Sequence, residues 1–236
     1  MATIYDCSDQ SGLLSGMRLA RGAIGRGELV VMPTDTVYGV AADAFDARAV
    51  QRLLDAKGRT RQSPPPVLVA RPDVMDALAA DIPDAVRRLV AEFWPGGLTV
   101  ILRSQPSLDW DLGDTGGTVA LRMPDHPLAL ELLADTGPLA VSSANLTGLA
   151  AARTAQEAHE MLGESVAVYL DGGAVGAPGD GHGNASTIVD ATGLLLPEGE
   201  LRIVRHGVIP ADEIFRVAAP GAQAQEAQAL PEEPPT

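Results

Sequence analysis

The sequence predicts a single-domain α/β protein built on an open, twisted sheet of mixed parallel and antiparallel strands flanked by helices. Hydrophobic residues make up 46% of the 236 residues and aromatic residues only 3%, so the chain can form one large aliphatic core. Apolar runs of strand length alternate with amphipathic segments early, whereas strands follow one another closely near the end. Alternation favours parallel pairing and closely spaced strands favour antiparallel pairing, which together predict a mixed sheet.

The first half of the chain divides into elements at turn-forming residues. Leu13, Met17 and Ile24 recur at helical spacing within 11–26, and the glycine at 27 is a typical helix stop. The apolar run 28–32 is typical of a buried strand and ends at a proline. A short strand is expected to open the chain, with further strands at 66–70, 98–102 and 118–123 and further helices at 47–56, 72–80 and 83–93.

The second half continues this alternation and then brings strands together. Thr154 and Glu157 have the spacing of a capping box, which predicts a helix from there to about residue 162. We also expect a helix at 126–134, strands at 139–142, 166–170, 186–190 and 201–204, and a short helix at 210–215. Residues 218–236 are rich in Pro, Ala, Gln and Glu without an apolar period, so we expect a disordered acidic tail after a domain over 1–217.

Charge and cysteine content disfavour several classes of protein. The chain has 31 Asp and Glu against 17 Lys and Arg, a formal charge of -14, which repels a long nucleic acid. Cys7 is the only cysteine, so an internal disulfide and a thiol metal cluster are both excluded. No apolar run approaches the ~20 residues that span a bilayer, and the N-terminus lacks the layout of a signal peptide. We therefore expect a cytoplasmic protein without a membrane partner.

A cluster of positive charge stands out against this acidic background. The only lysine of the chain, Lys57, lies beside Arg59 and Arg61, just after the helix expected at 47–56. Ammonium and guanidinium groups are the side chains that hold phosphate and carboxylate oxygens. The cluster therefore favours a bound anion over a merely solvated surface.

Polar side chains lie at the ends of two predicted strands. Thr34 and Thr36 follow the strand at 28–32, and Ser142, Ser143 and Asn145 lie at and beyond the end of the strand at 139–142. Strand ends are where α/β sheets bind ligands, and hydroxyls, amides and free N–H groups can line an anion pocket. The same residue types also form ordinary caps and turns, and this alternative stays open for each segment alone.

Two arginines end apolar strands and point to charge inside the protein. Arg122 and Arg205 follow the apolar runs 118–121 and 201–204, and a buried guanidinium needs an anionic partner. By contrast, the segment 94–99 is interpreted as structural, as a helix stop, a tight turn and a strand start. The glycine-rich stretch near 171–183 lacks the G-x-x-x-x-G-K-[ST] spacing of a phosphate-binding Walker A loop.

The order of these segments is more specific than any of them alone. The series is Pro-Thr-Asp-Thr-Val-Tyr-Gly at 33–39, Lys-Gly-Arg at 57–59, Trp-Pro-Gly-Gly-Leu-Thr at 94–99, Ala-Leu-Arg-Met-Pro at 120–124, Ser-Ser-Ala-Asn-Leu-Thr-Gly at 142–148, Ser-Thr-Ile-Val-Asp at 186–190 and Arg-His-Gly at 205–207. This series resembles the YrdC/Sua5 family of threonylcarbamoyl-AMP synthases. The resemblance extends from about residue 12 to residue 215 and is to the short, single-domain form of the family.

The resemblance implies a YrdC-like fold and an enzyme, a nucleotidyltransferase. Family members convert L-threonine, bicarbonate or CO2, and ATP into threonylcarbamoyl-AMP and pyrophosphate. The product serves the N6-threonylcarbamoyladenosine modification at position 37 of tRNA, so the implied partner is the tRNA threonylcarbamoyl transferase complex. The implied cofactor is Mg2+ that arrives with ATP, without metal ligands from the protein.

Matching motifs carry the family's contacts to residues of this chain. Lys57 and Arg59 are the implied catalytic cations, which meet the ATP phosphates. The other implied ATP contacts are Ser63, Thr118, Ser143, Asn145 and Arg205. The implied threonine contacts are Thr34, Thr36, Leu68, Arg122, Ser142 and Ser186. Among these, Arg122 is expected to meet the threonine carboxylate.

The chain departs from the family pattern at two of these positions. Ser63 stands where relatives usually carry Lys or Asn, and Leu68 where they often carry His. Arg61 is expected to supply the charge that Ser63 cannot.

Two alternative functions compete with the synthase. One is an RNA- or ribosome-binding module of the same fold, which the negative charge disfavours. The other is the related domain of hydrogenase-maturation carbamoyltransferases, which is joined to acylphosphatase and zinc-finger segments. A chain with one cysteine cannot form such a finger.

Overall fold

The structure is a computed structural model that describes residues 2–176 and 185–219. Residues 177–184 of the glycine-rich stretch and residues 220–236 of the expected tail lie outside the described residues. The last helix, α7 (Ala211–Ala218), runs one residue beyond the predicted domain end at 217. Within the described ranges, no helix is long and apolar enough to cross a membrane.

All strands in the described residues join one sheet, in the order β1-β9-β2-β3-β8-β4-β7-β6-β10-β11, with β5 attached to β6. The strands are β1 (Thr3–Asp6), β2 (Val30–Met32), β3 (Gly39–Asp43), β4 (Val67–Leu68), β5 (Ala79–Ala80), β6 (Leu98–Ser104), β7 (Thr118–Arg122), β8 (Leu139–Ser143), β9 (Val168–Asp171), β10 (Thr187–Asp190) and β11 (Arg202–Arg205). Pairs β1–β9, β2–β9, β4–β7 and β6–β10 are parallel, whereas β2–β3, β3–β8 and β6–β7 are antiparallel. The prediction of a mixed sheet is confirmed.

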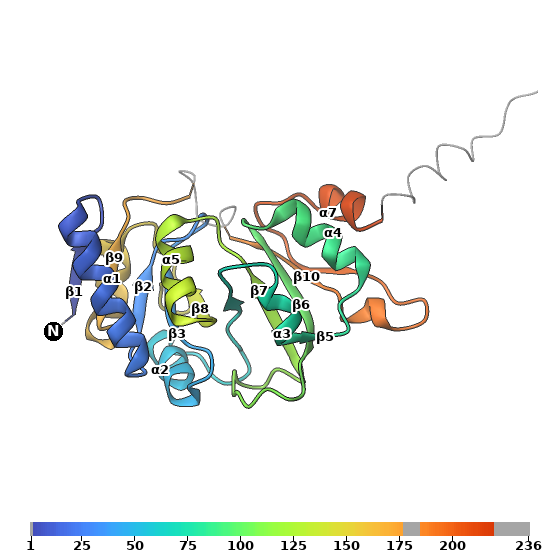
Figure 1. Cartoon of the computed structure of the whole chain (residues 1–236), viewed down its shortest axis with the longest axis horizontal. Coiled ribbons are helices and arrows are strands. Elements are labelled where there is room, and N and C mark those ends of the chain that lie inside the picture. Colours follow the sequence, from blue (N-terminus) through green and yellow to red (C-terminus); the bar gives the residue numbers. More distant parts are fainter. Residues whose placement is uncertain (1, 177–184, 220–236) are drawn as a thin grey trace, which may run out of the picture.

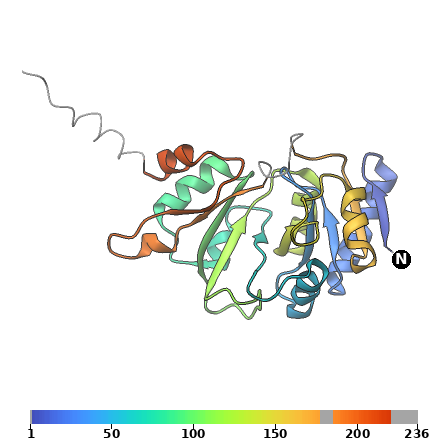
Figure 2. The same cartoon turned by 180° about the vertical axis from the view of Figure 1, so that it is seen from behind.

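Helices cover both faces of the N-terminal half of this sheet. The remaining helices are α1 (Gln10–Gly25), α2 (Ala47–Lys57), α3 (Val74–Leu78), α4 (Asp84–Phe93), α5 (Pro127–Thr136) and α6 (Ala155–Leu162), with short 3₁₀ turns η1 (Gly163–Ser165) and η2 (Thr192–Leu195). Helices α1 and α5 lie in front of the sheet in Figure 1, and α6 lies on the opposite face in Figure 2. One core cluster joins α1 and α5 to β2, β8 and β9, and another joins α2 and α6 to β2 and β3. This half of the sheet is therefore buried on both faces.

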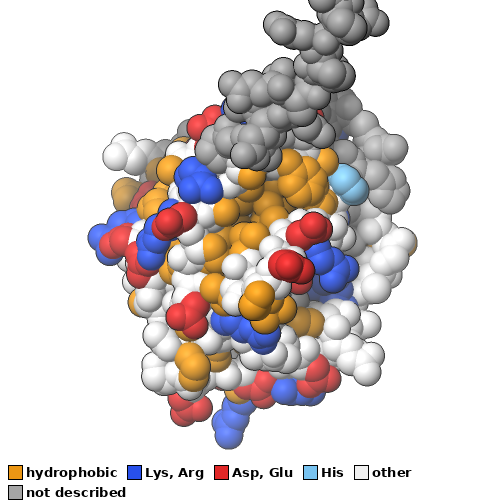
Figure 3. All heavy atoms as spheres, turned by 90° about the vertical axis from the view of Figure 1, so that its right-hand side faces the viewer, with side chains coloured by type: hydrophobic (Ala, Val, Ile, Leu, Met, Phe, Trp, Pro, Cys, Tyr) orange, Lys and Arg blue, Asp and Glu red, His pale blue; other side chains and the backbone are white. Residues whose placement is uncertain are grey.

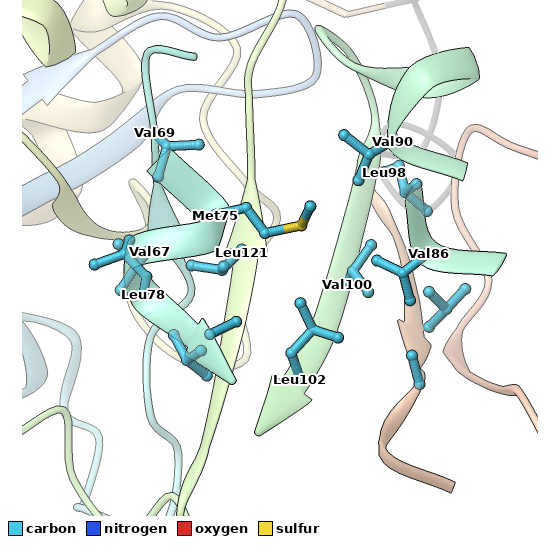
Figure 4. Close-up of a cluster of buried hydrophobic side chains, with 14 of the residues drawn as sticks. Val67, Val69, Met75, Leu78, Val86, Val90, Leu98, Val100, Leu102 and Leu121 are labelled. Atoms are coloured by element: carbon cyan, nitrogen blue, oxygen red, sulfur yellow. The ribbon is translucent and has the colours of Figure 1, made fainter. Parts of the chain in front are cut away.

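The C-terminal half of the sheet is packed on one face. Side chains of α3, α4 and α7 form a third core cluster with β6, β7 and β10. Figure 4 shows Met75 and Val86 of the helices packed against Leu98, Val100 and Leu121 of the strands. These strand residues belong to one side of the pleat, because side chains alternate between faces along a strand. The other face of β6, β7 and β10 is thus available for a site.

Two strands were not predicted from the sequence. Strand β3 has the sequence Gly-Val-Ala-Ala-Asp, and small residues are poor strand formers when judged locally. In the sheet it lies between β2 and β8, where space is short: a Cβ on Gly39 would come within 2.6 Å of Val141 Cγ1. The helix expected at 72–80 ends at Leu78, because Ala79 and Ala80 pair with β6 as β5. Tertiary pairing, not local preference, decides both segments.

The expected capping box at α6 forms only in part. Thr154 Oγ1 accepts a hydrogen bond from Glu157 N at 3.1 Å, as predicted. The Glu157 carboxylate, however, accepts from Arg153 N at 2.6 Å, one residue before the cap. The helix therefore begins where the spacing predicted, with its glutamate satisfying a neighbouring backbone donor.

An apolar surface lies on the side of the molecule that carries α7 and η2. Figure 3 shows hydrophobic side chains gathered on this face. Exposed large hydrophobic residues of these two elements are Leu195 and Phe215, followed along the chain from η2 by Leu196. None of the predicted site residues lies among them.

Candidate functional site

A cavity of about 350 Å³ opens on the uncovered face of the C-terminal half of the sheet. Along β6, Leu98 and Val100 point into the core while Thr99 and Ile101 line the cavity. Strand β7 repeats the pattern, with Leu121 in the core and its neighbours in the cavity wall. The period of two along each strand therefore gives one core face and one cavity face. Such a volume lies within the usual range for small-molecule sites.

Most of the predicted site residues meet in this cavity although they come from distant parts of the chain. Those that line it are Thr34, Thr36, Arg59, Leu68, Thr118, Arg122, Ser142, Ser143, Ser186 and Arg205. Among the described residues of the lining there are three guanidinium groups and no carboxylate. The cavity is therefore positive within an acidic protein, and a ligand that carries negative charge fits it.

Arg59 reaches the cavity because α2 ends sharply before it. Gly58 takes the left-handed conformation (φ 63°), and Arg59 N donates to Leu54 O at 2.8 Å, which turns the chain back toward the sheet. The Arg59 guanidinium donates to Ser142 Oγ at 3.1 Å. Burial lowers the pKa of Arg59, because desolvation destabilises its charged form; a bound anion would offset this destabilisation.

Arg205 approaches from β11, the strand at the C-terminal edge of the sheet. It donates to Ser186 O through Nε and Nη2, at 3.0 and 2.9 Å, and to Ser186 Oγ at 2.8 Å. Ser186 Oγ also lies 2.8 Å from Thr99 Oγ1. Burial lowers the pKa of Arg205, and the positive charges of Arg122 and Arg59 lower it further. Arg205 is thus close enough to both other guanidiniums to be repelled by them.

Arg122 is buried (7% exposed) at the end of β7 and is held from three sides. Its Nη2 pairs with Asp35 Oδ1 at 2.6 Å, Nη1 donates to Thr36 Oγ1 at 3.0 Å, and Nε donates to Gly96 O at 2.9 Å. The prediction that this guanidinium needs an anionic partner is confirmed, and Asp35 is that partner. Two of the five N–H donors of the side chain, one on each terminal nitrogen, have no such bond to a residue that the structure describes.

The hydroxyl proton of Thr34 can be assigned from its partners. Thr34 Oγ1 donates to Val37 O at 2.6 Å, which uses its only proton. It also accepts from Thr36 N at 3.2 Å and from Val37 N at 3.3 Å, and it lies 3.1 Å from Thr36 Oγ1. Thr36 Oγ1 accepts from Arg122, which leaves one of its lone pairs for a further hydrogen bond. This buried oxygen suits a ligand N–H or O–H group.

Three predicted site residues do not line the cavity. Lys57 is buried at the end of α2 and donates to Ser143 O, to Asn145 O at 2.7 Å and to Asn145 Oδ1 at 3.2 Å. Asn145 is likewise buried and turned into its own loop, where Nδ2 donates to two backbone carbonyls. Ser63 is exposed, next to the Pro64 that does line the cavity.

The expectation that Arg61 replaces a missing charge in the pocket is wrong. Arg61 binds Asp111 with two hydrogen bonds, at 2.9 and 2.7 Å, and lies 3.4 Å from Asp114. Its backbone carbonyl also accepts from Asp114 N at 2.8 Å. The side chain therefore ties two surface loops together, and its charge is neutralised there.

Sequence reasoning missed the contribution of the 94–99 turn to the site. This turn, interpreted as purely structural, supplies Gly96 O to Arg122 and Thr99 to the cavity wall. The Trp94–Pro95 bond is cis, and Trp94 Nε1 closes the turn on Leu98 O at 2.8 Å. The signal that could have found it is the strand alternation, which puts Thr99 on the face opposite Leu98.

A strap of residues 205–209 packs against this turn and fixes Ser186 from behind. Val208 N donates to Ala185 O at 3.0 Å, and Ile209 exchanges two hydrogen bonds with Thr187 Oγ1. The strap passes so close to Gly97 that a Cβ there would lie 2.2 Å from Val208 Cγ2. Close packing of the strap therefore depends on the absence of a side chain at 97.

We expect Gly97→Ala to lower the free energy of unfolding by about 1–3 kcal/mol through this clash. Val208 is 45% exposed, and its truncation leaves only ordinary contacts around the new methyl group. The double variant Gly97→Ala/Val208→Ala should therefore regain most of the loss. Urea unfolding of the two single variants and the double variant checks this; an additive loss in the double variant would contradict the packing described here.

A second hollow of about 460 Å³ lies at the N-terminal edge of the sheet. Its charged residues are engaged with their surroundings: Arg26 pairs with Glu28 at 2.6 Å, and Arg52 donates to Gly27 O. It contains none of the predicted site residues. The cavity over β6, β7 and β10 is therefore the candidate site.

Comparison with known proteins agrees with the fold and with the motifs. The sequence model of the Sua5/YciO/YrdC family, described as "Telomere recombination", matches residues 22–207. A Mycobacterium tuberculosis H37Rv protein is 48% identical over 217 residues, which cover 92% of this chain and 95% of that protein; it is named, provisionally, as a threonylcarbamoyl-AMP synthase. The threonylcarbamoyl-AMP synthase of Pyrococcus abyssi is 36% identical over 204 residues, 85% of this chain and 56% of that enzyme.

A solved structure extends the similarity to three dimensions. The crystal structure of P. abyssi Sua5 complexed with L-threonine superimposes with a TM-score of 0.78 at 32% identity. The match covers 92% of this chain and 60% of that one. With the family model spanning most of the chain, the sequence and the fold agree that this protein belongs to the Sua5/YciO/YrdC family.

Proposed function

We propose that this chain is an L-threonylcarbamoyladenylate synthase, a nucleotidyltransferase that makes threonylcarbamoyl-AMP and pyrophosphate from L-threonine, bicarbonate or CO2, and ATP. The observation that carries the proposal is a cavity with three guanidiniums and no carboxylate in its described lining, beside buried hydroxyls. Both ATP and threonine bring negative charge and hydrogen-bonding groups to such a site. The names of the relatives support this function over an RNA-binding module.

The threonine end of the cavity is proposed to lie at Arg122. Its two unused N–H donors suit a carboxylate, and Thr36 Oγ1 beside them can accept from the amino or hydroxyl group. Ser186 and Leu68 complete this end, together with Thr34 behind Thr36. Leu68 adds apolar surface where a methyl group can pack.

The ATP end is proposed to lie between Arg59 and Arg205. The Ser142 hydroxyl accepts from Arg59, Ser143 lines the cavity next to it in the chain, and Thr118 lines the cavity from the start of β7. Hard Mg2+ prefers carboxylate and phosphate oxygens, and the described lining offers hydroxyls but no carboxylate. The metal is therefore proposed to enter bound to the triphosphate, as part of the substrate MgATP.

The reaction needs no nucleophile from the protein. The neutral amine of threonine attacks CO2 and loses one proton, which forms the N–C bond of a carbamate. A carbamate oxygen then attacks the α-phosphorus of ATP, and the bond to the β-phosphate bridging oxygen breaks as pyrophosphate leaves. The proposed role of Arg59 and Arg205 is to hold the phosphates in line and neutralise the charge that develops on them.

The product is proposed to serve the N6-threonylcarbamoyl modification of adenosine 37 in tRNA. A mixed anhydride with AMP is labile, so its consumer must be close at hand; the proposed one is the tRNA threonylcarbamoyl transferase complex. The proposed location is the cytoplasm, where that tRNA chemistry takes place.

We expect the purified full chain to release pyrophosphate only when MgATP, bicarbonate and L-threonine are all present. The product should show the mass of threonylcarbamoyl-AMP. Arg48→Ala, an exposed change on α2 away from the cavity, serves as the control for handling and folding. Pyrophosphate release that does not require threonine would refute the proposed substrate, and no release under any condition would refute the enzyme.

A further inference from the structure

Lys57 is 1% exposed although its side chain carries an ammonium. Its Nζ donates to Ser143 O, Asn145 O and Asn145 Oδ1, and an ammonium has three N–H donors, so all of them are used inside the protein. We propose that Lys57 is a positioning residue, which holds residues 143–147 at the end of β8 and thereby places the Ser142 and Ser143 hydroxyls in the cavity wall.

The contact between α2 and this turn is made from both sides. Thr147 donates to Lys57 O through its backbone N–H at 3.2 Å and through Oγ1 at 2.8 Å. The Asn145 side chain then closes the turn internally, with Nδ2 donating to Leu146 O at 3.0 Å and to Leu149 O at 2.7 Å. The end of α2 and residues 143–149 thus form one hydrogen-bonded unit behind the cavity.

The burial of Lys57 has an electrostatic cost that an apolar side chain would avoid. Burial and, to a smaller extent, the positive charge of Arg59 lower the pKa of Lys57 to about 7. An apolar side chain of the same length would fill the space without this desolvation cost. It would, however, leave the Ser143 and Asn145 carbonyls, which converge on Nζ, without a donor.

The proposal rests on the proposed synthase activity and changes the role expected for Lys57. For Nζ to reach a phosphate in the cavity, it would have to give up three oxygen partners at once. Arg59, two residues on, lines the cavity, and among the described residues its guanidinium has one hydrogen-bond partner, Ser142 Oγ. Arg59 is therefore the cation of this pair that faces the nucleotide, and Lys57 acts through Ser142 and Ser143.

Two variants of the full chain test this by turnover. We expect Lys57→Met, once circular dichroism shows that it is folded, to lower kcat for pyrophosphate release by about 100-fold, because a small displacement of positioning groups has effects of that size. Thr147 is exposed and does not line the cavity. Thr147→Val keeps the shape of its side chain and removes only the hydrogen bond from Oγ1 to Lys57 O. It should lower kcat in the same direction by a smaller factor. Wild-type kcat in the folded Lys57→Met variant would overturn the proposal.

Nucleotide binding separates positioning from direct phosphate contact. Calorimetry with MgATP and with AMP gives the preference of each variant for the triphosphate without any need for turnover. The preference should be unchanged in Lys57→Met and reduced in Arg59→Met. Losing a charged hydrogen bond to the β- or γ-phosphate would lower the preference for MgATP over AMP by about 10-fold or more. A fall of that size in Lys57→Met would show that Lys57 binds one of these phosphates and would overturn the proposal. If the wild-type chain binds both nucleotides but makes no threonylcarbamoyl-AMP, the proposed function fails. The ratio of the affinities for MgATP and AMP would still decide the role of Lys57.

Discussion

Arg59→Ala is expected to lower kcat/KM for MgATP by about 10²–10³-fold while the chain stays folded. The guanidinium faces the cavity, where it would neutralise charge on the transferring phosphate, and such preorganised groups have their largest effect in the transition state. In the folded protein its described side-chain partner is Ser142 Oγ, a neutral group. Removing Arg59 therefore leaves no buried carboxylate unpaired, and the loss should fall on catalysis.

Steady-state pyrophosphate release checks this prediction, with unfolding midpoints measured in parallel. Arg59→Lys keeps a positive charge but loses the planar fork, so it should fall between alanine and the wild type. Arg48→Ala, on the exposed surface of α2, should match the wild type. A kcat/KM within twofold of wild type for Arg59→Ala would mean that Arg59 does not meet the nucleotide.

The cavity could be predicted from the sequence where its signals are local. The alternation in β6 separates Leu98 and Val100 from Thr99 and Ile101, and the same period in β7 carries Arg122 to the open face. Because successive side chains of a strand point to opposite faces, the residues between the core residues lie together on the other face, where they can line a site. Polar residues on that second face are a signal that a single sequence contains.

Residues whose partners are distant in the chain could not be placed in this way. The acceptors of Lys57 lie 86 and 88 residues away, and Arg61 binds Asp111 across 50 residues. Locally, both cations belong to one short cluster with Arg59, and nothing in the spacing distinguishes them. Only the fold shows that one is buried, one lines the cavity and one ties surface loops together.

Strand β3 illustrates the same limit for the fold. Its small residues have weak strand preference, yet it is the strand that joins β2 to β8 in the sheet. Close packing against Val141 leaves no room for a side chain at Gly39. The property that hides the strand in the sequence is therefore the one that fits it to its position.

Arg122→Met is the second change with a large expected effect, because it removes both a site cation and half of a buried ion pair. Burial lowers the pKa of Arg122, which Asp35 opposes through its charge and its hydrogen bond. Losing one partner of such a pair costs about 3–5 kcal/mol of unfolding free energy, since Asp35 would be left without its guanidinium. Threonine binding should be lost as well, which appears as a KM raised by about 10-fold or more.

The double variant Arg122→Met/Asp35→Leu separates the two effects. Replacing both members of a buried ion pair by apolar residues is often close to neutral, so the double variant should recover much of the stability lost by Arg122→Met. Recovery will be incomplete because Asp35 also accepts from Asp125 N at 3.0 Å. Activity should not recover, since no guanidinium remains at the end of β7 for the carboxylate of threonine. Urea unfolding of both variants checks the effect on stability, and KM for threonine checks the effect on substrate binding. A double variant with restored threonine KM would show that Arg122 serves the fold and not the substrate.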